Sequence, residues 1–169
     1  MYIDESINPS GRLIGRFKIN FLIIPLLIII TASAGSYFAQ TGMQWYNTLV
    51  LPSFTPPSYM FSIVWSLIFT LAAISLLIIW NKYSKETLFS LVIMLFFLNG
   101  LINVGWNVVF FVYHNIGFSV IVAILLAADV LLLIIFIRRF SLIASYLLYP
   151  YFIWLIFAAF LSFNVWLLN

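Results

Sequence analysis

The sequence predicts an all-α membrane protein, a single bundle of five transmembrane helices. Of its 169 residues, 66% are hydrophobic and only 7% are charged, whereas a soluble domain is about 25% charged. The mean hydropathy is +1.21. Five apolar runs are each long enough to cross the hydrocarbon core of a bilayer, which takes about 20 helical residues. So few charges could not cover a soluble globule, and so apolar a chain is not disordered.

A polar tail, residues 1–20, precedes the predicted five-helix domain of residues 21–169. The first apolar run extends over residues 21–39. The tripeptide Ala32-Ser33-Ala34, behind a basic segment, resembles a signal-peptidase site. The alternative, which we favour, is an uncleaved first membrane helix.

Residues 40–58 form a loop without a charged side chain. The prolines at positions 52, 56 and 57 favour extended or turn conformations there. The loop is too apolar to float in water, because it also carries Trp45, Tyr46, Leu49, Leu51 and Phe54. We therefore expect it to lie on the helix ends.

Four further spans follow, at about residues 59–80, 88–111, 118–137 and 142–168, joined by short polar turns. Pro150 lies inside the last span. Since proline has no N–H, it removes one backbone hydrogen bond, and we expect the fifth helix to kink there.

All seven basic residues fall on one side of the predicted bundle. They precede the first span or lie between spans two and three or four and five, and are Arg12, Arg16, Lys18, Lys82, Lys85, Arg138 and Arg139. Basic residues gather on the cytoplasmic side of a membrane. We therefore expect the N-terminus inside and the C-terminus outside. We also expect the protein to be integral to a bacterial cell membrane.

The residue counts exclude several chemistries. The chain has no cysteine, one histidine and four acidic residues. These counts exclude disulfides, iron–sulfur clusters and histidine-rich metal cages, and they make a di-carboxylate hydrolase site close to impossible. We expect no metal, no cofactor and no nucleic-acid partner, since the basic residues are scattered among membrane segments.

Three asparagines form a polar stripe on the third span. Asn99, Asn103 and Asn107 recur every four residues, beside Trp106, and this spacing places them on one helix face. That face must point into the bundle, because unsatisfied amides are costly in hydrocarbon. The stripe is either interhelical glue, worth about 0.6 kcal/mol per hydrogen bond, or the polar wall of a ligand pocket.

Asp129 is the one acid inside a predicted span. It lies nine residues before Arg138, about 13 Å along a helix, and so near the middle of the membrane. An ionisable group there is a functional candidate. The structural alternative is a carboxyl that is neutral or hydrogen-bonded to an asparagine or tyrosine.

The six tryptophans divide by depth. Those at span ends, Trp45, Trp80 and Trp166, are typical of interfacial belts. Trp65, Trp106 and Trp154 lie deeper, where an indole N–H needs a partner. The deep indoles either pack the core or form a flat wall for a planar ligand.

Two sets of motifs run through the loop and the spans. The first is W-Y…L…P-S-x-x-P-P…W, formed by Trp45-Tyr46, Leu49, Pro52-Ser53, Pro56-Pro57, Trp65 and Trp80. The second is formed by Asn99, Asn103, Trp106-Asn107 and Phe110-Phe111, followed by Pro150-Tyr151 and Trp154. Together they resemble the TspO/MBR family of tryptophan-rich sensory proteins and translocator proteins, over about residues 35–169.

The resemblance implies a five-helix homodimer whose first loop covers a pocket. It implies binding of tetrapyrroles such as protoporphyrin IX, and for mitochondrial members also cholesterol and benzodiazepine-type ligands. It further implies, for some bacterial members, breakdown of porphyrin in light. The candidate ligand-binding residues are Phe54, Pro57, Trp65, Asn99, Asn103, Trp106, Asn107, Trp154 and Ala158.

Three positions depart from the family pattern. The aromatic residue before Thr-Pro-Pro is Phe54 rather than tryptophan. An acid common early in the fourth span is replaced by Val122, and Asp129 lies two turns later. No basic residue follows Arg139, which removes the cholesterol pattern that needs one, and we do not expect cholesterol binding.

Three functional hypotheses remain. The leading one is a membrane sensor or binding protein for tetrapyrroles and other apolar planar ligands. The second is light-dependent porphyrin degradation, with Trp65 and Trp154 as electron donors to the excited ring. The third is a transporter or channel for porphyrins or other hydrophobic molecules, although the chain lacks paired ionisable groups in its spans.

The one-sided distribution of basic residues predicts the topology. Reporters fused after Lys85 and after Arg139 should read cytoplasmic, and a reporter inserted within residues 45–59 should read external. Paired alkaline phosphatase and fluorescent-protein fusions measure this. A cytoplasmic signal from residues 45–59 would overturn the assignment.

Overall fold

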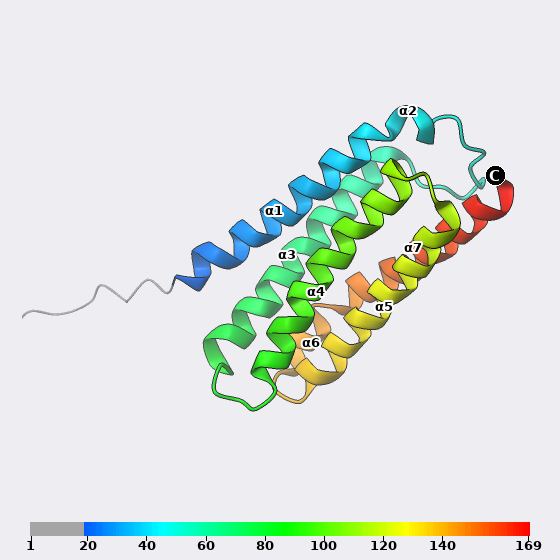
Figure 1. The fold of residues 1–169 in the computed structure, drawn as a ribbon. Helices are drawn as coiled ribbons and strands as arrows, with labels where there is room; N and C mark the ends of the chain where they lie inside the picture. Colours follow the sequence, from blue (N-terminus) through cyan, green and yellow to red (C-terminus); the bar gives the residue numbers. More distant parts are fainter. Residues whose placement is uncertain (1–18) are drawn as a thin grey trace, which may run out of the picture.

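The computed structural model of the chain describes residues 19–169, in which every regular element is helical. Five helical spans cross the long dimension of the molecule: Asn20–Thr41, Ser58–Lys82, Phe89–Val112, Ile116–Arg138 and Leu142–Leu168. Figure 1 shows them side by side, with the connections at the two ends. The predicted fold class is confirmed, and each predicted span limit lies within two residues of the observed one. Arg12, Arg16 and Lys18 lie outside the described residues.

Helix α5 (Ile116–Arg138) is the most buried of the five spans. In its most apolar stretch 56% of the residues are buried, against 11% in α1 (Asn20–Thr41). The core around it joins α3 (Ser58–Lys82), α4 (Phe89–Asn107) and α7 (Tyr149–Leu168), and Ile79, Val92 and Val130 are fully buried there. The outer helices turn large apolar side chains outward, as a protein solvated by hydrocarbon requires.

Helix α4 does not remain α-helical to the end of its span. It passes into a π-helical turn, η1 (Val108–Val112), which inserts extra backbone and changes the direction of the following side chains. The chain then leaves the span through His114, whose φ of 54° is the one positive value at a non-glycine residue in the part of the chain described. The His114 ring stacks on Trp45, with ring centroids 4.1 Å apart.

The fifth span is interrupted rather than kinked. A short helix, α6 (Leu142–Tyr146), is separated from α7 by a turn at Leu147 and Leu148. Pro150 is the second residue of α7, and in the first turn of a helix a proline costs little because its N–H would be unpaired in any case. The expected effect of Pro150 is therefore corrected: the helix restarts at the proline instead of bending around it.

Buried serine hydroxyls hold α6 in place. Ser75 of α3 donates to the Ala144 carbonyl at 2.8 Å, and Ser145 donates to the Ile134 carbonyl of α5 at 3.3 Å. Ser141 caps the helix by accepting a hydrogen bond from the Ala144 N–H. The interruption is thus fixed by side-chain hydrogen bonds to two neighbouring helices.

The loop between α1 and α3 lies on the helix ends, as predicted. It contains one helical turn, α2 (Met43–Tyr46), and its aromatic and leucine side chains pack on Phe110, Ile116, Leu161 and Val165. Asn169 clamps the middle of the loop by hydrogen bonds at 3.0 Å to both the N–H and the carbonyl of Val50. Figure 1 shows the C-terminus beside this loop.

Replacing Gly42 with alanine should destabilise the protein, because a Cβ atom there would lie 2.8 Å from both the Cα and the carbonyl carbon of Phe111 in η1. Overpacking of this kind costs about 1–3 kcal/mol. Thermal unfolding in detergent, followed by circular dichroism, measures the loss. Gly105→Ala is the matched control, since a Cβ atom there meets nothing within 4 Å. Equal destabilisation by both variants would contradict the steric argument.

Candidate ligand-binding site

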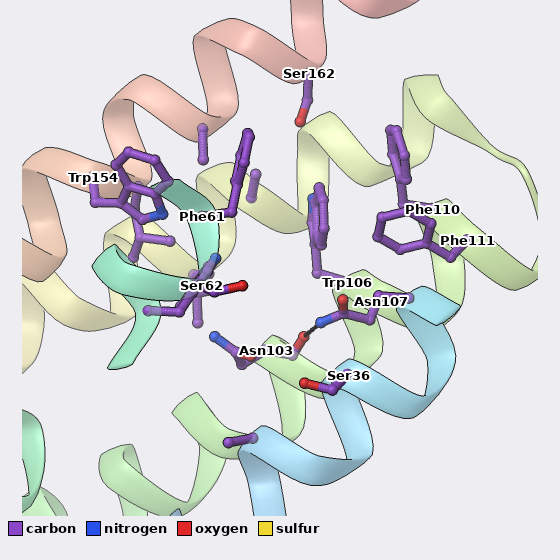
Figure 2. A pocket seen from close by; sticks show the side chains of 18 of the residues that line it. Ser36, Phe61, Ser62, Asn103, Trp106, Asn107, Phe110, Phe111, Trp154 and Ser162 are labelled. Carbon is purple, nitrogen blue, oxygen red and sulfur yellow. Dashed lines mark hydrogen bonds between the residues drawn. The ribbon is translucent and has the colours of Figure 1, made fainter. Parts of the chain in front are cut away.

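A cavity of about 400 Å³ lies between α1, α3, the α4–η1 span and α7, with residues of α5 at its inner wall and α2 at one end. Its volume falls within the range of about 300–1,000 Å³ that is typical of small-molecule sites. Figure 2 shows side chains from these elements converging on one open space.

Aromatic side chains form two opposite walls of this cavity. On one side Trp154 of α7 meets Phe61 of α3 edge to face, with ring centroids 5.6 Å apart. On the other side Trp106 of α4 stacks on Phe110 of η1 at 5.1 Å and 11°. Figure 2 shows Trp154 and Phe61 facing Trp106 across the space. Trp65 also lines the cavity, so that indoles of three helices surround it.

Two of these indoles have no hydrogen-bond partner. The Nε1 atoms of Trp106 and Trp154 are both buried, and no acceptor in residues 19–169 lies within reach of either. A buried polar group left unpaired costs about 1–3 kcal/mol. Both indoles line the cavity, but their Nε1 atoms have almost no accessible surface, so that the acceptor atoms of a ligand reach them only when neighbouring side chains move aside.

The asparagine stripe serves both of the roles considered for it. Asn99 lies away from the cavity, where its Nδ2 donates to Asp129 at 2.9 Å and its Oδ1 accepts from the Tyr151 hydroxyl at 3.0 Å. Asn103 and Asn107 line the cavity. Asn103 Nδ2 also donates to the Tyr151 oxygen at 3.1 Å, and Asn107 Nδ2 donates to the Asn103 carbonyl at 3.0 Å. The stripe is glue at Asn99 and pocket wall from Asn103 onward.

The cavity opens along α1 and α3. Ser36, Ser62 and Ser66 line it and are nevertheless exposed. No lysine, arginine, aspartate or glutamate is among the lining residues. Tyr46 of α2 is the titratable residue at the covered end, and burial raises the pKa of its phenol above its usual range. The site is thus an uncharged, mostly aromatic space with hydroxyl groups along its open side.

The sequence profile of the TspO/MBR family matches residues 21–167, from the first span to the last. The chain belongs to the TspO/MBR family.

Relatives in this family come from distant organisms. The chain is 36% identical to the tryptophan-rich protein TspO of Bacillus cereus over 126 residues, 74% of this chain and 80% of the relative. It is 36% identical to TspO of Archaeoglobus fulgidus over 146 residues, 85% and 93% of the two chains. The human translocator protein is 27% identical over 134 residues, 78% and 79% of the two chains. The chain is therefore an integral membrane protein of the TspO/MBR family.

The structure gathers most of the candidates that the TspO/MBR resemblance and the residue patterns suggested. Those that line the cavity are Trp65, Asn103, Trp106, Asn107, Trp154 and Ala158. Three others do not line it. Phe54 stacks on Phe160 at 5.5 Å, Pro57 caps the start of α3 beside the lining residue Ser58, and Asn99 belongs to the hydrogen-bonded cluster around Asp129.

Sequence reasoning missed the contribution of α1. Thr31, Ala32, Gly35, Ser36 and Ala39 line the cavity, and a Cβ atom on Gly35 would lie 3.2 Å from Asn107 Nδ2. The run of small residues from Thr31 to Ser36 is the available signal, since small side chains allow close approach of helices in membranes. Within this run, Ala32-Ser33-Ala34 resembles a signal-peptidase site in the sequence, whereas in the structure the run forms part of the cavity wall.

Asn99→Leu should lower thermal stability more than Asn103→Leu. The first variant deprives buried Asp129 of its donor and Tyr151 of its acceptor, a loss of about 1–3 kcal/mol. The second removes one donor to Tyr151, worth about 0.5–1.5 kcal/mol. Thermal unfolding of the purified variants measures both.

Asn164→Leu is the control for this comparison, since the Asn164 amide donates only to the Phe160 carbonyl of its own helix. It should unfold within error of the wild type. If Asn103→Leu destabilises the protein as much as Asn99→Leu, the division of the stripe into two roles is wrong.

Proposed function

We propose that this membrane protein binds a planar, mostly apolar ligand of the tetrapyrrole class, such as protoporphyrin IX, in the cavity between α1, α3, α4 and α7. The observation that carries the proposal is the pair of buried indole N–H groups, on Trp106 and Trp154, without a partner at facing walls of an aromatic cavity. Core packing alone does not require an indole where phenylalanine or leucine would leave no donor unpaired.

The shape and polarity of the cavity support this ligand class. The faces of Trp65, Trp106 and Trp154 offer stacking surfaces to a flat ring system, and aromatic pairs are worth about 0.5–1.5 kcal/mol beyond the area they bury. The exposed serine hydroxyls at the open side offer hydrogen bonds to the polar edge of a ligand while its ring remains enclosed. This arrangement matches a molecule with an apolar disc and polar substituents at one edge.

Titration of the purified protein in lipid nanodiscs with protoporphyrin IX, followed by quenching of tryptophan fluorescence, tests the proposal. We expect saturable binding to one site per chain. Ala158→Phe should weaken it at least tenfold, because the new ring occupies the cavity that Ala158 lines. Ala128→Phe is the matched control, since Ala128 of α5 is exposed and lies outside the cavity lining. Quenching that does not saturate, or that Ala158→Phe leaves unchanged, would overturn the proposal.

A second activity, breakdown of the bound porphyrin in light, is favoured by the position of Trp65 and Trp154 at the cavity. Indole donates an electron to an excited ring far more readily than phenyl does. Trp65→Phe and Trp154→Phe should therefore retain much of the affinity for protoporphyrin IX but lose most of any breakdown under illumination, measured by bleaching of the Soret absorbance. If the double variant bleaches porphyrin at the wild-type rate, the two indoles have no photochemical role.

A further inference from the structure

A chain of three hydrogen bonds connects the cavity to the buried carboxyl group of Asp129. Asn103 Nδ2 donates to the Tyr151 oxygen at 3.1 Å, the Tyr151 hydroxyl donates to Asn99 Oδ1 at 3.0 Å, and Asn99 Nδ2 donates to Asp129 Oδ2 at 2.9 Å. All four side chains are at least nine-tenths buried, and of the four only Asn103 lines the cavity. The chain crosses from α4 to α7, back to α4 and on to α5.

Every donor in this chain points toward Asp129. A carboxylate can only accept hydrogen bonds, whereas an amide offers either its oxygen or its NH₂ group and a phenol does both at once. Asp129 therefore requires the NH₂ group of Asn99 beside it. Asn99 then presents its oxygen to Tyr151, and Tyr151 in turn presents its oxygen to Asn103. The direction of each member is set by the member before it.

The last member of the chain faces the cavity. Nδ2 of Asn103 is directed at Tyr151. No donor within residues 19–169 reaches the other end of this amide, Asn103 Oδ1. We propose that Asp129 is a positioning residue: through Asn99 and Tyr151 it fixes the Asn103 amide so that the cavity presents a hydrogen-bond acceptor, which selects ligands with an N–H or O–H group. This inference rests on the proposed ligand-binding function of the cavity.

The opposite direction of the chain is chemically possible without Asp129. Asn99 could then donate to Tyr151, Tyr151 to Asn103 Oδ1, and Asn103 would turn its NH₂ group to the cavity. With Asp129 ionised, this reversal would set the Asn99 oxygen against a carboxylate oxygen, two acceptors without a proton between them, whereas a protonated carboxyl would donate to the Asn99 oxygen and permit it. The carboxylate thus excludes one of two otherwise similar arrangements.

No other charged group in the described residues competes for Asp129. The elements packed on α5 are α4, η1, α6 and α7, and their titratable side chains are tyrosines at positions 146, 149 and 151. Asp129 Oδ1 has no hydrogen-bond partner within residues 19–169. The amide of Asn99 is therefore the one polar contact through which Asp129 acts, and that contact leads to the cavity.

The test uses three planar tricyclic probes of similar size: carbazole, with an N–H donor; 9-fluorenone, with a carbonyl acceptor; and fluorene, with neither. The measured quantity is the donor preference, the Kd of fluorenone divided by the Kd of carbazole, obtained by tryptophan quenching in nanodiscs. Asp129→Asn keeps the shape of the side chain but lets the chain run in either direction. It should lower the donor preference about 2- to 10-fold, the range of one hydrogen bond, and leave the Kd of fluorene unchanged.

Two further variants show whether the effect passes through the chain. In an Asn103→Leu background, Asp129→Asn should have no effect on the donor preference, because the terminal amide is absent. Tyr151→Phe, which leaves Asp129 in place and breaks the chain in its middle, should lower the preference as Asp129→Asn does. Glu86→Gln, the same loss of charge in the turn between α3 and α4, is the control and should change none of the three Kd values.

The possible outcomes separate the inference from the proposed function. An unchanged donor preference in an Asp129→Asn variant that still binds fluorene would overturn the inference, as would an equal effect of Asp129→Asn with and without Asn103. If Asp129→Asn no longer binds fluorene, Tyr151→Phe decides: an unchanged preference in that variant also overturns the inference. Absence of saturable protoporphyrin IX binding to the wild type overturns the proposed function alone, provided that the tricyclic probes bind.

Discussion

Hydrocarbon supplies no hydrogen-bond partner, and this constraint governs every polar side chain in the bundle. In water an unpaired amide or hydroxyl turns to solvent, but within a bilayer it must pair inside the protein or remain unpaired at a cost. Ser75 and Ser145 pair with backbone carbonyls and hold the interrupted fifth span. Asn99 and Tyr151 pair around Asp129. Of the buried polar atoms that remain unpaired in the described residues, the indole Nε1 atoms of Trp106 and Trp154 belong to residues that line the cavity.

An unpaired donor and the paired cluster lie about two turns apart on α4. Trp106 leaves its indole N–H unpaired at the cavity, whereas Asn99 uses both ends of its amide away from it. Asn103 lies between them and belongs to both environments. One face of α4 thus changes from a helix–helix contact to a cavity surface within three turns. The asparagine stripe is therefore neither interhelical glue alone nor a pocket wall alone.

The spans could be predicted from the sequence because hydropathy is a local property. An apolar run in the sequence has nearly the same residue limits as the helix that it forms. The interruption before Pro150 could not, since it depends on serine contacts to Ala144 and Ile134 that join distant helices. The same holds for the site. Periodicity places Asn99 and Asn103 on one face. It does not reveal that Asn99 forms hydrogen bonds with Asp129, 30 residues away, and with Tyr151, 52 residues away. The contribution of α1 was missed because a run of small side chains is as typical of close helix packing as of a pocket wall.

Helix α1 combines two properties that rarely occur together. It supplies one side of the cavity through Gly35, Ser36 and Ala39, and it is the least buried of the five spans. Its large apolar side chains, such as Leu26 and Ile30, are exposed in the described chain, as in a helix that faces acyl chains. The lipid is therefore a structural component of the recess, and a binding constant obtained in a detergent micelle describes a different receptor from one obtained in a bilayer. The thickness and lateral pressure of the membrane act directly on α1, and through it on the shape of the cavity.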